Sequence, residues 1–505
     1  MRRLVDALLG LMGLLATVQF IAIAWIHLRS PAELDYIEGP IMDQIVRVAR
    51  GQPLYVAPSL SFVPLAYMPG FTFLAALPAR LFGPAYWEPR LISVIATLGI
   101  AALCFVATRA ESRRWALAAA AAGLYLIGYR FAGGGHYDVA RPDSLMVFLA
   151  LAGIATLRFT TGRGGAIASA MLMTAAFFTK QHGLLFAAGA MGHLALNDRR
   201  RVLPFALTLV LGCGGGFLVL TRVLGPWFAF YTWDVPSHWS QLNLGRIQAY
   251  VRNGLFGLIG PMTVGSLLSL ALPERAWRGR AGVWAWTCAA GIATGMMASL
   301  DPNAWKHLFI PTMACFSLFG PIALHRLAER LVGEQQERAT RVSVVCAAVL
   351  VLQYGALQFA PRLELPARDA PAAHAELIRR LRALPGPVIL LHHGFFTWQA
   401  DKGISIQDIG FGDIQRARGN ALLRRDPGAL ERVLDPLRAG PGRPLIITDM
   451  PLSEAGPIWT ELGGTYELRE DWGKTFAALA PPWGYAGVPR YVYEPREAAP
   501  GGGRP

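Results

Sequence analysis

The sequence predicts a polytopic α-helical membrane protein that carries a small α/β domain at its C-terminal end. Of the 505 residues, 53% are hydrophobic and only 16% are charged, whereas soluble proteins are about 25% charged. Apolar runs of roughly 18 to 22 residues, long enough to cross a bilayer as helices, recur along the first two-thirds of the chain. After about Pro361, helical and strand-like patterns alternate instead. These observations favour a membrane core followed by a soluble domain.

About eleven segments are predicted to span the bilayer. They lie near residues 7–28, 91–108, 115–130, 144–158, 165–179, 184–197, 203–221, 253–272, 282–299, 307–324 and 342–360. With a cytoplasmic N-terminus, about 17 arginines fall in the N-terminus and the inner loops, against about seven basic residues in the short outer loops. This asymmetry agrees with the positive-inside rule and accounts for the net charge of +14 without a nucleic-acid partner. We therefore expect a multi-pass protein of the cell (inner or plasma) membrane.

The chain is expected to divide into three parts. Residues 1–360 form the transmembrane core, whose large first outer loop, 29–90, is broken by prolines into short pieces lying along the membrane surface. Residues 361–497 form a soluble α/β domain, which an odd number of spans places on the extracytoplasmic side. The patterns that predict it are helical at 372–384 and 426–439 and strand-like at 387–392 and 443–450. The Gly/Pro-rich tail, 498–505, is expected to be disordered.

Two carboxylates, Asp35 and Glu38, follow the first predicted span. At the bilayer edge, in a region of reduced dielectric, one of them could act as a general base while the other binds a cation or a substrate hydroxyl. They could equally be ordinary acids at the outer end of a helix. Their spacing alone leaves both interpretations open.

A glycine-rich segment between the third and fourth spans collects several polar side chains. Gly133 to Gly135 allow close backbone approach, and an imidazole, a guanidinium and two carboxylates follow. Pro142 and Asp143 also suit the first turn of the fourth span. That structural explanation does not cover the other three polar side chains, which are His136, Asp138 and Arg141.

Two of the chain's four lysines lie in short outer loops, in Lys180-Gln181 and in Lys306-His307. A lysine at headgroup depth is well placed to hold a lipid phosphate. The alternative is that each lysine only extends from a helix end to the interface. Together with Arg141, the two lysines favour an anionic lipid headgroup.

The sequence predicts no metal site and no disulfide framework. All five cysteines lie inside predicted spans. The vicinal pair His392-His393 ends a predicted strand, where its side chains would point to opposite faces, so we expect no zinc there.

Taken in order, these motifs resemble the GT-C superfamily of integral-membrane glycosyltransferases. The likeness is greatest to the bacterial branch related to protein O-mannosyltransferases and lipid A aminoarabinose transferases, and it covers about residues 1–325. It rests on the acidic motif of the first outer loop and on five further segments, which are Val48 to Tyr55, Val63 to Gly70, Arg90-Leu91, Lys180-Gln181 and Asp301 to Pro311.

The resemblance implies a transferase that moves a hexosyl or pentosyl group from a polyprenyl-phosphate donor to an extracytoplasmic glycan, lipid or protein acceptor, with inversion. It implies Asp35 or Glu38 as the catalytic base. Many relatives have adjacent acids, but Ile37 precedes Glu38 here, so the resemblance leaves open which carboxylate is the base and whether a divalent cation takes part. The residues implied to bind donor or acceptor are His136, Asp138, Arg141, Asp143, Lys180, Gln181, Lys306 and His307.

Two other functions remain as alternatives, a secondary transporter and a non-catalytic membrane assembly protein. A transporter usually places its ionisable groups near the bilayer midplane, on broken helices in repeated halves. Here the ionisable groups gather at outer helix ends, and no repeated halves are visible. An assembly protein would not need this many polar residues at one surface.

Overall fold

The computed structural model describes residues 2–239, 242–271, 279–301, 304–332, 336–417, 428–439, 442–483 and 485–496. The predicted disordered tail, 498–505, and Pro302-Asn303 of the late motif lie outside these residues. Each predicted span overlaps a helix of the structure. In chain order these helices are α1 (Arg2–Leu28), α4 (Trp87–Ser112), α5 (Trp115–Ile127), α6 (Asp143–Phe159), α7 (Gly162–Thr179), α8 (Gly183–Asn197), the continuous helix α9–η1–α10 (Arg199–Leu209, Val210–Gly215, Gly216–Leu224), the pair η3 (Tyr250–Leu258) and α14 (Gly260–Leu270), α15 (Val283–Ala298), η6–α16 (Lys306–Phe309, Ile310–Val332) and α17 (Gln336–Leu357).

Length and composition single out fewer of these helices as membrane spans. Four described helices are long and apolar enough to cross a bilayer, namely Arg3–Leu28, Trp87–Ser112, Arg199–Leu224 and Lys306–Arg330. A fifth is gained if the pair Leu244–Leu258 and Gly260–Leu270, bent by 96°, counts as one span. The chain is therefore a helical protein of polytopic type, and eleven spans stay a prediction.

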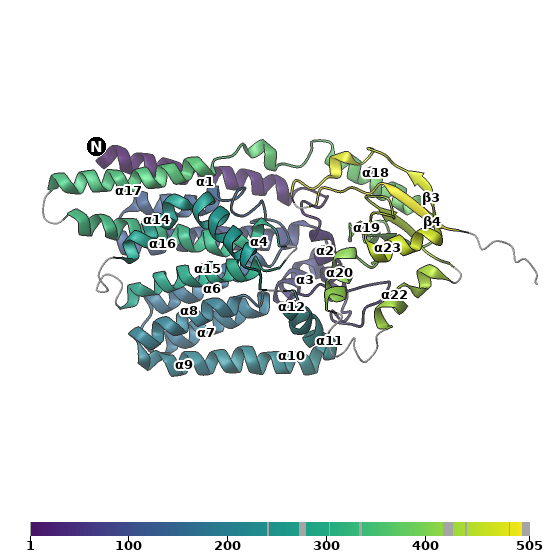
Figure 1. Cartoon of the computed structure of the whole chain (residues 1–505), viewed down its shortest axis with the longest axis horizontal. Coiled ribbons are helices and arrows are strands. Elements are labelled where there is room, and N and C mark those ends of the chain that lie inside the picture. The colour runs from purple at the N-terminus through teal and green to yellow at the C-terminus, as the bar shows by residue number, and fades with distance from the viewer. Residues whose placement is uncertain are drawn as a thin grey trace, which may run out of the picture.

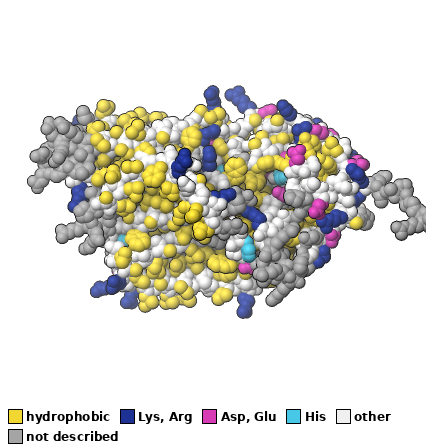
Figure 2. All heavy atoms as spheres, viewed as in Figure 1, with side chains coloured by type: hydrophobic (Ala, Val, Ile, Leu, Met, Phe, Trp, Pro, Cys, Tyr) yellow, Lys and Arg dark blue, Asp and Glu magenta, His cyan; other side chains and the backbone are white. Residues whose placement is uncertain are grey.

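The helices lie side by side along the long axis of the molecule and form a bundle at one end of it (Figure 1). Small residues let neighbouring helices approach closely, as in other membrane bundles. At Gly13 of α1, an added Cβ would lie 2.3 Å from the carbonyl oxygen of Ala119 in α5. Over the bundle the visible surface is mostly apolar, whereas the acidic side chains gather toward the opposite end (Figure 2).

The first outer loop contains two helices with different surroundings. In α3 (Gly70–Phe82), the side chains of Leu77, Leu81 and Phe82 are exposed, as a helix lying at a membrane surface requires. In contrast, α2 (Glu38–Ala49) is buried from Glu38 to Val46. Its apolar side chains share a core with residues that follow position 361, so this part of the loop differs from the predicted surface piece.

The C-terminal segment, defined as the described residues after 361, forms the other end of the molecule (Figure 1). The predicted helices and strands correspond to α18 (Ala370–Ala383), β1 (Val388–Leu390), α22 (Ala429–Arg438) and β2 (Leu445–Thr448). Two further strands, β3 (Tyr466–Asp471) and β4 (Tyr491–Pro495), were not predicted. The sheet order is β1-β2-β4-β3, with β1 and β2 parallel and β4 antiparallel to both of its neighbours.

Several short helices fill the space between the bundle and the sheet. The aromatic stretch after α10 forms α11 (Pro226–Ala229), η2 (Phe230–Asp234) and α12 (Val235–Ser237), and α13 (Leu244–Ala249) leads on to η3. From the C-terminal segment, α19 (Phe396–Gln399) and α20 (Asp408–Arg416) lie on the bundle side of the sheet (Figure 1). Of these elements, η2, α12 and α20 line a cavity between the bundle and the sheet.

Candidate functional site

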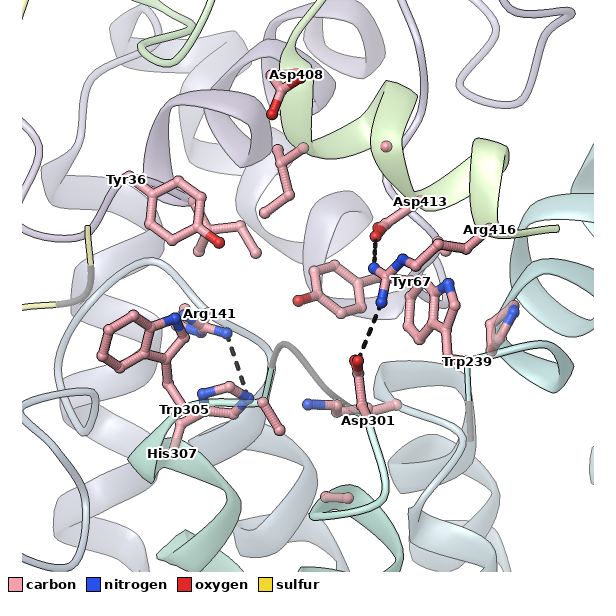
Figure 3. Close-up of a pocket in the computed structure, with 18 of the residues that line it drawn as sticks. Tyr36, Tyr67, Arg141, Trp239, Asp301, Trp305, His307, Asp408, Asp413 and Arg416 are labelled. Atoms are coloured by element: carbon pink, nitrogen blue, oxygen red, sulfur yellow. Dashed lines mark hydrogen bonds and ion pairs between the residues drawn. The ribbon is translucent and has the colours of Figure 1, made fainter. Parts of the chain in front are cut away.

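A cavity of about 1200 Å³ lies between the helix bundle and the C-terminal segment. Its bundle wall includes Arg141, the α7–α8 turn with Lys180 and Gln181, and His307 of η6. Its opposite wall comes from α20 and from residues near the ends of β1 and β2. Aromatic side chains that line it are Tyr36, Tyr67, Trp233, Trp239, Trp305 and Tyr485. The cavity therefore joins a cationic wall to an aromatic surround (Figure 3).

Arg141 and Lys180 supply the positive charge of the bundle wall. The guanidinium Nη1 of Arg141 donates to Oδ2 of Asp35 at 2.6 Å, and its Nε lies 3.6 Å from Oδ2 of Asp143. The ammonium of Lys180 donates to Oδ1 of the same Asp143 at 2.7 Å. Burial opposes the charge of Arg141, but its interactions with Asp35, Tyr67 and Asp143 together raise the pKa of Arg141 above its ordinary value. Both cations thus face the cavity, each held from behind by a carboxylate.

Asp35 lies in the turn between α1 and α2 and is fully buried. The turn is fixed by the backbone N–H of Glu38, which donates to the carbonyl of Asp35 at 2.9 Å. Its Oδ2 binds Arg141, whereas its Oδ1 accepts no hydrogen bond from the described residues. Asp35 itself does not line the cavity, but Tyr36 does. The carboxylate of Asp35 therefore lies behind the cavity wall, in contact with Arg141, which lines the cavity.

The second predicted carboxylate, Glu38, has a different environment. It forms a fully buried ion pair with Arg90, whose Nε and Nη2 donate to Oε1 and Oε2 at 2.9 and 2.6 Å. The backbone N–H groups of Leu34 and Ala140 donate to the same two oxygens, each at 2.7 Å. Both oxygens of Glu38 therefore already accept hydrogen bonds from within the protein, and Glu38 does not line the cavity.

The two histidines of the predicted set meet beside Arg141. The rings of His136 and His307 lie 5.5 Å apart, and Nε2 of His307 is 3.5 Å from Nη2 of Arg141 (Figure 3). Nε2 of His136 lies 3.9 Å from Oδ2 of Asp35. Burial lowers the pKa of His136 in spite of this carboxylate and so favours the neutral imidazole.

The remaining predicted residues divide between the cavity and its surroundings. Gln181 lines the cavity and donates to the carbonyl of Thr232 at 2.7 Å. Asp138 is buried behind the wall, where it pairs with His27 at 2.8 Å and accepts from the hydroxyl of Tyr129 at 2.8 Å. Lys306 is exposed at the start of η6 and does not line the cavity. The structure thus brings most, but not all, of the predicted set together.

Solved structures with the same arrangement of helices are known, although neither a family model nor a curated protein sequence matches the chain. ArnT from Cupriavidus metallidurans bound to undecaprenyl phosphate is similar with a TM-score of 0.58 at 13% identity, over 96% of this chain and 97% of that one. Its apo form is similar with a TM-score of 0.59 at 14% identity, over 94% and 97%. The archaeal oligosaccharyltransferase AglB from Archaeoglobus fulgidus, in complex with an inhibitory peptide and a dolichol-phosphate, is similar with a TM-score of 0.53 at 10% identity, over 95% and 76%.

The chain has the GT-C fold. ArnT and AglB are both membrane glycosyltransferases of that superfamily, and the match runs through the bundle and the C-terminal segment alike. The family resemblance of the outer motifs is thereby confirmed at the level of fold.

In this GT-C fold, sequence reasoning missed the wall that the C-terminal segment contributes. Arg416 of α20 donates to Oδ1 of Asp301 at 3.0 Å, pairs with Asp413, and lies over the ring of Trp239 at 5.2 Å (Figure 3). Burial raises the pKa of Asp413 to about 7, although Arg416 opposes this shift. No local pattern in the sequence marks Asp413 or Arg416, because their role depends on where α20 docks.

Among the described residues of this GT-C fold, no three His, Cys, Asp or Glu side chains are grouped so that they could hold a metal ion. At Asp35 the neighbouring positive charge is the guanidinium of Arg141.

Proposed function

We propose that the chain is an inverting membrane glycosyltransferase that moves a sugar from a polyprenyl-phosphate donor to a hydroxyl of a glycan, lipid or protein on the extracytoplasmic side. Two proteins of the same fold support the donor class, since ArnT binds undecaprenyl phosphate and AglB binds dolichol-phosphate in their structures. The observation that carries the proposal is the Asp35–Arg141–Asp143–Lys180 network at the cavity wall. It provides two carboxylates, of which Asp35 is the candidate base, and two cations within one chain of contacts.

Arg141 and Lys180 suit the phosphate of the donor. Guanidinium and ammonium groups form short, charge-assisted hydrogen bonds with phosphate oxygens, and both side chains line the cavity. In the transition state the leaving phosphate gains negative charge, which fixed cations stabilise more strongly than they stabilise the bound donor. His136 and His307 lie beside this position and would orient the sugar.

The ion pair between Asp35 and Arg141 also suggests an order of events. In the structure Oδ2 of Asp35 is held by the guanidinium of Arg141 at 2.6 Å, so that oxygen is not available to the hydroxyl of an acceptor. An arriving phosphate competes for Arg141, and its capture of the guanidinium would release Asp35. The base would thus be activated when the donor is in place.

The proposed transfer is a single displacement. The hydroxyl of the acceptor gives its proton to Asp35 while its oxygen forms a bond to the anomeric carbon of the donor. On the opposite face, the bond between that carbon and the phosphate oxygen breaks, and its electron pair leaves with the polyprenyl phosphate. General-base assistance of this kind contributes about 10²- to 10⁴-fold to a rate.

We assign the base to Asp35 and a structural role to Glu38. The oxygens of Glu38 already accept from Arg90 and from two backbone N–H groups. Asp138 would likewise hold the loop before α6 from behind, through His27 and Tyr129. Lys306 lies at the exposed edge of the site and would interact with the phosphate only as the donor enters.

We further propose eleven spans in the inner (plasma) membrane, with the N-terminus cytoplasmic and the C-terminal segment outside. Glu111 at the end of α4 binds Arg158 of α6 at 2.7 Å and Arg326 of α16 at 2.8 Å. Arg114, before α5, pairs with Asp6 near the start of α1. These contacts support the proposed topology, because they join residues of the N-terminus and of several predicted inner loops.

The proposal is tested by measuring sugar transfer in membranes that contain the wild type or Asp35→Asn, with a mixture of polyprenyl-phosphate sugars as donors. We expect Asp35→Asn to lose at least about 10²-fold in rate. The matched control is Asp401→Asn, because Asp401 is an exposed aspartate on the C-terminal segment that pairs only with exposed Arg382 among the described residues. Equal transfer by Asp35→Asn and the control would refute the base assignment, and no transfer by the wild type from any donor would refute the enzyme proposal.

A further inference from the structure

A buried histidine joins the C-terminal segment to the turn that carries Asp35. His393 follows β1, and its Nδ1 is hydrogen-bonded to Oε1 of Glu33, which lies two residues before Asp35. Its Nε2 is 2.9 Å from Oδ2 of Asp449, which follows β2. All three side chains are only 1% exposed. One imidazole therefore connects two carboxylates from distant parts of the chain.

While both carboxylates are ionised, this contact requires a charged imidazole. A neutral ring has one N–H, whereas two ionised carboxylates need two donors, so only the protonated ring satisfies both. Burial alone would favour the neutral ring, but Asp449 and Glu33 together raise the pKa of His393 to about 10. Burial raises the pKa of Glu33 to about 7, against the attraction of His393. The other titratable or charged groups facing this contact are Glu38, Asp43, Tyr86 and Arg90 from the bundle side and His392 and Tyr485 from the C-terminal side.

The backbones on either side of the histidine are also in close contact. A Cβ added to Gly394 would lie 2.5 Å from Oδ2 of Asp43 and 2.7 Å from the carbonyl carbon of Gly39. The α2 helix therefore fits directly against the segment after β1, and there is no room for either partner to shift toward the other. On its other side the turn is held by Arg90, whose Nη1 and Nη2 donate to the carbonyls of Ser30 and Ala32, each at 2.8 Å.

We propose that His393 is a positioning residue for sugar transfer, which acts through Glu33 to hold the turn that places Asp35 against Arg141. This inference rests on the proposed function. Arg141 holds only Oδ2 of Asp35, and Oδ1 has no hydrogen-bond partner among the described residues, so the location of the carboxylate also depends on the backbone of its turn. Glu33 is hydrogen-bonded to the C-terminal segment through His393, and Tyr485 of that segment packs edge-on against Tyr36 of the same turn. A misplacement of about 1 Å at a reacting group can reduce a rate by about 10²-fold.

Two substitutions at His393 separate positioning from simple docking. In His393→Asn the side-chain amide takes the place of Nδ1 and keeps a donor to Glu33, whereas in His393→Gln it takes the place of Nε2 and keeps a donor to Asp449. Positioning predicts a fall in kcat of about 10²-fold for His393→Gln and less than about 5-fold for His393→Asn, with the KM for the donor changed by less than about 3-fold in both. Equal losses in the two variants, or wild-type kcat in His393→Gln, would overturn the proposal.

The matched control is His374→Gln, because His374 is a partly buried histidine of the same segment whose Nε2 binds Gln399 at 3.0 Å, away from the cavity. It should keep wild-type kcat. Should His393→Gln fail to fold, Glu33→Ala removes the same contact from the other side and leaves His393 paired with Asp449. Wild-type kcat in Glu33→Ala would refute the positioning role.

Hydrogen exchange measured by mass spectrometry gives a readout that does not depend on transfer. Exchange over residues 30–37 should be faster in His393→Gln than in the wild type, His393→Asn or His374→Gln. Unchanged exchange in His393→Gln would overturn the inference even if transfer is active. If no protein transfers sugar but the exchange pattern is as expected, the proposed function fails while the contact through Glu33 stands.

Discussion

The buried pair of Arg90 and Glu38 should be far more important for stability than for catalysis. Arg90 makes five hydrogen bonds, two to Glu38 and three to the backbone carbonyls of His27, Ser30 and Ala32, at 2.6 to 2.9 Å. Both side chains are completely buried. Removing one partner of a buried ion pair costs about 3–5 kcal/mol, because the remaining charge is left uncompensated.

The two single substitutions should differ in size. In Glu38→Gln, the guanidinium keeps its three carbonyl partners and an amide oxygen, so we expect a cost near about 3 kcal/mol. In Arg90→Met, three carbonyls and a carboxylate lose their donors at once, and unsatisfied buried groups add about 1–3 kcal/mol each. We therefore expect about 5 kcal/mol or more for Arg90→Met.

The assay is thermal unfolding of the purified full chain in detergent. At roughly 2 °C per kcal/mol, Tm should fall by roughly 6 °C for Glu38→Gln and roughly 10 °C for Arg90→Met. Glu376→Gln is the matched control, because Glu376 pairs with Arg379 and Arg380 on the surface, where such pairs contribute about 0–1 kcal/mol. A Tm for Arg90→Met within about 1 °C of the control would refute the structural role of the pair.

Two further outcomes are expected. The pKa of His393 is raised from 6.5 to about 10 and that of Glu33 from 4.5 to about 7, so the folded chain binds more protons at these sites than the unfolded chain between about pH 4.5 and pH 10. The stability of the fold, measured as Tm, should therefore fall as the pH rises through that window. A Tm profile that is equally steep in His393→Gln would contradict this prediction. Lys180→Ala should weaken the binding of undecaprenyl phosphate by about 10-fold or more, since it removes a charge-assisted hydrogen bond. The control is Lys402→Ala, which should leave this affinity unchanged, because the ammonium of Lys402 binds the carbonyl of Leu384. Equal affinities of the two variants would argue against phosphate binding at Lys180.

The helical elements could be predicted because they depend on local composition. Every predicted span overlaps a helix, since an apolar run of that length has few other ways to satisfy its backbone. Strand β3 could not be predicted in the same way. Its residues after Tyr466 are all exposed and mostly charged, and it is a strand because it pairs with β4.

The site could be predicted only in part, because its residue types are local but their pairing is not. Asp35 and Arg141 stand out in outer motifs, and they meet across 106 positions of sequence. Glu33, by contrast, is a single acid with no motif of its own, and its partner His393 is 360 positions away. The different roles of Asp35 and Glu38 also depend on a distant residue, Arg90, which binds the carboxylate of Glu38 but not that of Asp35.

We propose that the Arg141–Lys180 wall binds the phosphate of a polyprenyl-phosphate donor and that this binding releases Asp35. The most direct measurement is an experimental structure of the full chain with undecaprenyl phosphate. We predict the phosphate within hydrogen-bonding distance of Arg141 and Lys180, with the guanidinium moved away from its position 2.6 Å from Asp35. A phosphate bound elsewhere, or one bound while the Asp35–Arg141 ion pair remains intact, would contradict this proposal.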